Sequence, residues 1–224
     1  MNLTKSQDYF NPLDVKSRCH IIGCGSVGST VAELLLRLGI RNLSLYDFDF
    51  VSSHNLANQM FEHADIKRLK VDAVRDMLCR INPQVKHDIQ TYSNGWDEKT
   101  RLSGYVFLCL DNIDLRREIA TLNKANQSIR AMFDFRTRLE EAQHYAADWK
   151  NPALVKNFLN SMDFTHEEAR KNTPVTACNV EIGIAPTVRI ICAFGVANFM
   201  NYIRKGELKK VMKVDVFGFD IDAF

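Results

Sequence analysis

Three glycines near the N-terminus have the spacing that brings a protein backbone close to a phosphate group. Gly23, Gly25 and Gly28 form the pattern G-x-G-x-x-G directly after the apolar residues 20–22. The first two glycines allow a tight turn and a close approach to an anion, and the third allows a helix to pack against the strand. The N–H groups at the start of that helix attract negative charge. The pattern therefore predicts a site for a mononucleotide or a dinucleotide.

A carboxylate follows at the distance that ribose recognition requires. Residues 27–38 carry apolar side chains at helical spacing, Gly39 stands where helices commonly end, and residues 43–46 form a second strand pattern. Asp47 comes next, about 20 residues after the last glycine, where a carboxylate usually accepts hydrogen bonds from ribose hydroxyls. Strand, helix and second strand together indicate the first βαβ unit of a Rossmann-like, nucleotide-binding sheet.

The first half of the chain continues this alternation of strands and helices. We expect further strands at 85–89, 105–110 and 129–133, and helices over 71–81 and 115–122. Alternation of this kind predicts an α/β fold, with a doubly wound, mainly parallel sheet and right-handed crossovers.

The second half is less regular. Its patterns predict a strand at 143–147, a short helix at 152–159, an apolar helix over 182–200 and a terminal strand over 211–224. We expect a single domain over residues 1–224, with a nucleotide-binding core at 14–136 and a substrate-side segment at 137–224. The irregular stretch 140–176 is the expected place of substrate recognition.

Composition and charge exclude several classes of protein. The net charge is +2 and the basic residues are dispersed, so no basic stripe indicates nucleic acid. The polar N-terminus is unlike a signal peptide, and Arg189 in the middle of the apolar segment 182–200 favours a buried helix over a membrane span. The six cysteines form no C-x-x-C pair, which indicates reduced thiols and a cytoplasmic protein.

Several separately spaced motifs resemble one family. The chain has GCGSVG, then YDFDFVSSHNLANQMF where the ThiF/MoeB/HesA family shows D-F-D-x-V-x-x-x-N-L-x-R-Q, then a lysine that opens RLKVDAVRDMLCRINPQ, and finally LCLDNIDLRREI. These are adenylating domains related to ubiquitin-activating enzymes. The resemblance implies that ATP and Mg²⁺ are used and that a substrate carboxylate attacks the α-phosphate, giving an acyl-adenylate and pyrophosphate. It also implies a ubiquitin-like protein or a peptide with a free C-terminal carboxylate as partner, and a homodimer.

The resemblance assigns roles to the residues near the predicted nucleotide. Lys70 would stabilise charge on the phosphates, unless it is an ordinary solvated lysine of a first helical turn. Asp111 would hold Mg²⁺ together with phosphate oxygens, and Asn112 lies beside it; Asp111 is also a candidate helix cap. Asn55 and Gln59 would orient phosphate or ribose, or else bond only to the backbone of their own loop.

An arginine of the family pattern is missing, because this chain has Asn58 before the glutamine. Arg136, after a predicted strand, is the candidate replacement for this phosphate-binding cation, and Arg116 and Arg68 are alternatives. For each arginine the ordinary interpretation is an exposed ion pair.

One cysteine is a candidate nucleophile. In TPVTACNVEIGIAPTV, Cys178 resembles the cysteine that takes the acyl group as a thioester in some family members. The alternative is a buried structural thiol. Because the zinc cysteine pairs of many relatives are absent, no metal other than Mg²⁺ is expected.

Two other functions use the same fold. An NAD-dependent oxidoreductase would need the same glycines and Asp47, but it leaves Lys70 and the pair Asp111 and Asn112 unexplained. A catalytically impaired nucleotide-binding adaptor would keep the fold and carry Asn58 as the sign of lost turnover.

Overall fold

The apolar segment before the glycine pattern forms the central strand of an eight-stranded sheet. The computed structural model describes residues 1–171 and 183–224. The strand order is β3-β2-β1-β4-β5-β6-β7-β8; β1 to β5 are parallel, and β6, β7 and β8 are antiparallel. The strands are β1 Cys19–Ile22, β2 Leu43–Tyr46, β3 Gln90–Tyr92, β4 Gly104–Leu108, β5 Ile129–Thr137, β6 Glu141–Asp148, β7 Val211–Asp215 and β8 Asp220–Ala223. The predicted α/β fold with a mainly parallel sheet is confirmed.

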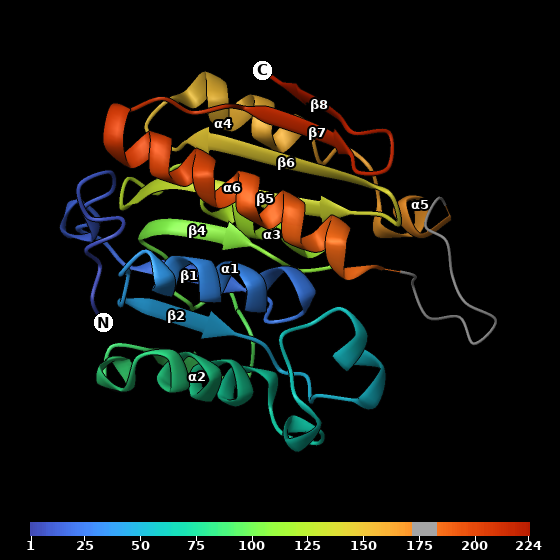
Figure 1. Ribbon diagram of the computed structural model, residues 1–224. Helices are drawn as coiled ribbons and strands as arrows, with labels where there is room; N and C mark the ends of the chain where they lie inside the picture. The colour runs from blue at the N-terminus through green and yellow to red at the C-terminus, as the bar shows by residue number, and fades with distance from the viewer. Residues whose placement is uncertain (172–182) are drawn as a thin grey trace.

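Helices cover both faces of this sheet (Figure 1). Helices α1, α2 and α6 share one apolar core with one face, and α3 and α4 share a second core with the other. Helix α6 packs along α1 and against β5 and β6. The helices are α1 Ser26–Arg37, α2 Lys70–Ile81, α3 Ile113–Leu122, α4 Pro152–Asn160, α5 His166–Lys171 and α6 Ala185–Lys205.

Short 3₁₀ helices shape the connections. They are Pro12–Asp14, Ser53–Ala57, His63–Asp65 and Pro83–Val85. The long connection after β2 holds two of them, each closed by a capping box in which a side chain accepts from the backbone at both ends. This connection is therefore an ordered wall beside the carboxyl end of β2.

Helix α6 is the apolar segment that the sequence predicts to be buried. It begins at Ala185 with Pro186 in its first turn and ends before Gly206, whose φ is 71°. Among the residues that the structure describes, no helix is long and apolar enough to cross a membrane.

Two sequence predictions are wrong in detail. The strand predicted at 85–89 lies at β3, because Asn82 caps Pro83–Val85 as a 3₁₀ helix and delays the strand. The terminal strand predicted over 211–224 is a hairpin of β7 and β8. Its turn forms where the Asp215 carboxylate accepts hydrogen bonds from two successive N–H groups, at 3.1 and 2.8 Å.

Candidate nucleotide site and adjoining pocket

The three glycines differ in what their neighbours require. A Cβ on Gly23 would lie 2.6 Å from the carbonyl oxygen of Cys109, and one on Gly28 would lie 1.8 Å from that of Gly23. Both glycines are therefore needed for the loop to pack against β4 and α1. A Cβ on Gly25 would meet only the Oε1 atom of Gln59, at 3.9 Å. Packing does not explain this glycine, and the open space beside it fits the approach of a phosphate.

Asp47 lies against the glycine loop, as the sequence predicts for a ribose-binding carboxylate. Its Oδ2 accepts a hydrogen bond from the Cys24 N–H at 2.6 Å, and its Oδ1 accepts one from the Asp49 N–H at 2.8 Å. Burial raises the pKa of Asp47 above its usual value, while the two backbone donors and Lys70 oppose this rise. The carboxylate is thus fixed by backbone donors and keeps further lone pairs for a ligand.

Lys70 is not a solvated lysine. It opens α2, is 8% exposed, and its Nζ donates to the Oδ2 of Asp49 at 2.8 Å. The Asp49 carboxylate itself is half exposed. Because Lys70 also influences the pKa of Asp47 and Cys24, its charge is felt at the glycine loop. A buried cation beside a phosphate-binding loop can stabilise charge that develops on a nucleotide.

Asn55 and Gln59 have different surroundings. The Oδ1 of Asn55 accepts from the N–H and the hydroxyl of Ser52, at 2.9 and 3.0 Å, so this side chain closes its own loop. The Oε1 of Gln59 is buried and, within the described residues, has no hydrogen-bond partner. An unpaired buried acceptor is costly, and near Gly25 it would be satisfied by a ligand hydroxyl.

Asp111 and Asn112, at the end of β4, have different surroundings. The side chain of Asn112 caps α3, its Oδ1 accepting from the Leu115 N–H at 3.1 Å. Asp111 is exposed and therefore remains available to a ligand. The described residues contain no group of three His, Cys, Asp or Glu side chains that could hold a metal ion. A lone carboxylate fits Mg²⁺ that arrives with phosphate oxygens, which complete its shell.

The arginines proposed to replace the missing family arginine are already engaged. Arg68 pairs with Asp65 and Asp76. Arg116 and Arg136 both bind Asp134, at 2.6 and 2.7 Å. Each of the three guanidinium groups thus has a carboxylate partner, although the buried Nε of Arg116 has no hydrogen-bond partner within the described residues. Asn58 itself donates to the carbonyl oxygen of Gly183 at 3.1 Å, and so links its loop to the start of α6.

The Asp134 carboxylate is completely buried between these two arginines. Burial alone would raise its pKa, but the guanidinium groups of Arg116 and Arg136 outweigh burial and hold the pKa below its usual value. Arg136 is fixed further, since it donates to the carbonyl oxygen and the hydroxyl of Ser161, at 2.7 and 3.0 Å, and lies 4.1 Å from the centre of the Tyr145 ring. Arg136 is therefore held in a fixed position at the wall of the pocket, and its role toward phosphate stays a prediction.

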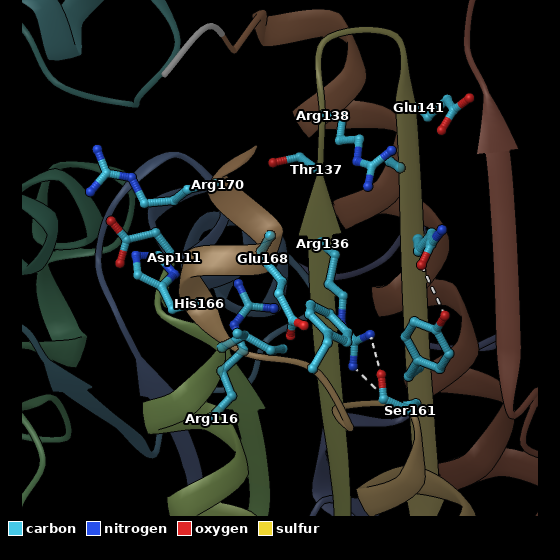
Figure 2. A pocket seen from close by; sticks show the side chains of 16 residues that line it. Asp111, Arg116, Arg136, Thr137, Arg138, Glu141, Ser161, His166, Glu168 and Arg170 are labelled. Atoms are coloured by element: carbon cyan, nitrogen blue, oxygen red, sulfur yellow. Dashed lines mark hydrogen bonds between the residues drawn. The ribbon is translucent and has the colours of Figure 1, made fainter. Parts of the chain in front are cut away.

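A pocket of about 410 Å³ adjoins Asp111 (Figure 2). Its walls come from the start of α3, the β5–β6 hairpin, the end of α4, and α5. Sequence patterns predicted recognition in the stretch 140–176 but did not identify Arg138, Tyr145 or Phe164, which line the pocket. No local motif marks them, because the pocket forms only when distant segments meet. Cys178, the candidate nucleophile, lies outside the described residues.

The family model for ThiF proteins matches residues 15–222. The chain belongs to the ThiF family. Among curated ThiF relatives, ubiquitin-like modifier-activating enzyme 5 of Gallus gallus is 34% identical over 116 residues, which are 45% of this chain and 29% of that protein. Molybdopterin-synthase adenylyltransferase of Escherichia coli is 34% identical over 110 residues, which are 46% of this chain and 43% of that protein. The chain therefore matches less than half the length of these relatives.

Solved structures share the ThiF fold. Crystal structures of PaaA and of Escherichia coli MccB with AMPCPP and MccA each give a TM-score of 0.69, at 16% and 18% sequence identity. Each alignment covers 95% of this chain and 65% of the other chain. At this level of identity the likeness shows the fold alone.

Proposed function

We propose that this ThiF-family chain catalyses the ATP-dependent adenylation of a substrate carboxylate. The observation that carries the proposal is the buried cation of Lys70, which pairs with the half-exposed Asp49 close to the glycine loop. In the proposed reaction a carboxylate oxygen forms a bond to the α-phosphorus of ATP. The bond from that phosphorus to the bridging oxygen breaks, and its electron pair leaves with pyrophosphate. No proton transfer is needed.

Each residue has a distinct task in this reaction. The loop at Gly25 lets the backbone approach the phosphates, and Asp47 accepts hydrogen bonds from the ribose. Lys70 stabilises the negative charge that grows on the α-phosphate and on the departing pyrophosphate. Asp111 would hold Mg²⁺, which supplies further charge neutralisation when bound. The Oε1 of Gln59 accepts a hydrogen bond from a ribose hydroxyl.

The substrate and the assembly are further parts of the proposal. The substrate is the C-terminus of a ubiquitin-like protein or peptide, which agrees with the name of the relative ubiquitin-like modifier-activating enzyme 5 and with the presence of MccA in an MccB structure. We propose a cytoplasmic homodimer, in line with the family and with the five free cysteines of the described residues. Transfer of the acyl group from the adenylate to Cys178, with release of AMP, is a separate proposed step. It predicts a conjugate of protein and substrate that added thiols cleave and that Cys178→Ser does not form.

The first experiment compares ligand effects on thermal unfolding. At 100 times its dissociation constant, a ligand stabilises the native state by about 2.7 kcal/mol. Magnesium-ATP should raise the Tm, and NAD should not. Pyrophosphate exchange with carboxylate peptides then distinguishes an enzyme from an adaptor. A Tm shift with NAD alone would contradict the proposal. A Tm shift with magnesium-ATP but no pyrophosphate exchange with any of the carboxylate peptides would favour the adaptor.

A further inference from the structure

The pocket beside Asp111 has two chemically different ends (Figure 2). Asp111, at the carboxyl end of β4, lies at one end. At the other end the pocket is bounded by the β5–β6 hairpin, from which Arg138 projects. Its volume of about 410 Å³ lies in the range of pockets that bind small ligands, and it can hold one or two amino-acid residues.

The floor at the hairpin end is rigid. The Arg136 guanidinium is held by Asp134 at 2.7 Å and by Ser161 at 2.7 and 3.0 Å, and it stacks on Tyr145 at 4.1 Å. Contacts on several sides prevent this guanidinium from turning toward a ligand. A bound side chain would therefore meet a fixed surface, and binding would cost little reorganisation of the protein.

The lining carries carboxylates as well as guanidinium groups, namely Asp111, Glu141 and Glu168. The buried Asp134 pairs with both Arg116 and Arg136. Glu168 accepts hydrogen bonds from the N–H and the hydroxyl of Thr165, at 2.7 and 3.0 Å. Arg138 adds a third guanidinium, and the described residues offer it no ion pair at 4.0 Å or less. The Glu141 side chain on β6 points away from Arg136 (Figure 2). The hairpin end is therefore suited to an anion.

We propose that this pocket binds the last residues of the substrate polypeptide and that Arg138 pairs with an acidic side chain close to the reacting carboxylate. The inference rests on the proposed function, which puts the reacting carboxylate near Asp111. An acidic residue whose main chain starts there can extend its side chain along the pocket to the hairpin. The substrate is accordingly a polypeptide with Glu or Asp among its last three residues.

Peptide binding tests the inference without requiring turnover. The probes are fluorescein-labelled hexapeptides of Gly and Ser with a free carboxyl terminus, in which one of the last three positions is Glu or Gln. Their affinities are measured by anisotropy in the presence of magnesium and a non-hydrolysable ATP analogue. For at least one position we expect the Glu peptide to bind about tenfold more tightly than its Gln partner, since a charged hydrogen bond is lost in the Gln peptide.

Variants separate Arg138 from general charge. Arg138→Ala should reduce the Glu preference to less than twofold, Arg138→Lys should retain part of it, and Arg37→Ala on α1 should leave it unchanged. Equal affinities for every Glu and Gln pair, or a preference that survives Arg138→Ala, would overturn the inference. Pyrophosphate exchange with the same peptides tests the proposed function separately. A Glu preference in binding without exchange would support this pocket and contradict adenylation. Exchange without a Glu preference would support adenylation and contradict the role of this pocket.

Discussion

Lys70 combines a buried place in the fold with the role that we propose for it in the reaction. Its charge is buried beside the half-exposed carboxylate of Asp49, which solvates it in the absence of a ligand. Sequence spacing identified the lysine through its place behind the D-F-D motif, but burial and its partner needed the structure. Bound phosphates would provide a second anionic partner at the glycine loop.

Removing this cation should affect catalysis more than stability. Lys70→Ala should lower the rate of pyrophosphate exchange by about 10²-fold or more, because a preorganised positive charge is lost. The variant should remain folded, because the half-exposed Asp49 carboxylate can be solvated by water once its lysine partner is gone. Exchange rates and urea unfolding are compared with those of Lys210→Ala, an exposed lysine outside the site. Normal exchange in Lys70→Ala would refute the assignment.

For Asp134 we expect the opposite: its replacement should reduce the stability of the fold strongly. Asp134→Asn leaves two guanidinium groups without their shared carboxylate, and loss of one partner of a buried pair costs about 3–5 kcal/mol. Asp76→Asn, which affects a partly exposed pair with Arg68, should cost about 1 kcal/mol or less. Urea unfolding at pH 7 measures both variants. Equal losses would show that the buried network is not a major source of stability.

At the scale of elements, periodicity and caps predicted most of the sheet, while the site required long-range contacts. The βαβ unit of β1, α1 and β2 was readable because each of its signals is local. The start of β3 was not, since the capped Pro83–Val85 turn competes with its strand pattern. The contacts of Arg136 could not be predicted from the sequence either, because its partners Ser161 and Tyr145 come from other parts of the chain.

The glycine loop offers a matched pair of substitutions. Gly28→Ala places a methyl group 1.8 Å from a backbone oxygen, so α1 must move, and overpacking of this kind typically costs about 1–3 kcal/mol or more. Gly25→Ala has room in the protein, its nearest neighbour being 3.9 Å away, but its methyl group occupies the approach of the phosphates. We expect Gly28→Ala to lower the Tm, and Gly25→Ala to keep the Tm but lose the shift with magnesium-ATP.

A retained ATP shift in a stable Gly25→Ala protein would place the nucleotide elsewhere. A lower Tm of Gly25→Ala without ligand would instead show that the fold requires Gly25.

At the scale of the whole molecule, two histidines buried on opposite faces of the sheet couple stability to pH. Burial lowers the pKa of both His20 and His144 to about 4. In neutral form, His144 donates from Nδ1 to the carbonyl oxygen of Asp134 and accepts from Asn198. The fold therefore stabilises the uncharged rings, and protonation must weaken it.

The direction of the pH effect follows from proton counting. Between about 4 and 6.5 the unfolded chain binds protons at these histidines and the folded chain does not, so the unfolding free energy rises with pH. This stabilisation is fully present above 6.5 and is lost as the pH falls toward 4; each histidine contributes up to about 3 kcal/mol. Urea unfolding at several pH values between 5 and 7 should therefore show a smaller slope in His144→Gln than in the native chain, whereas His54→Gln at the surface should keep the slope. Equal slopes in all three proteins would mean that the folded chain binds a proton at His144 as readily as the unfolded chain does, which would contradict a lowered pKa of His144.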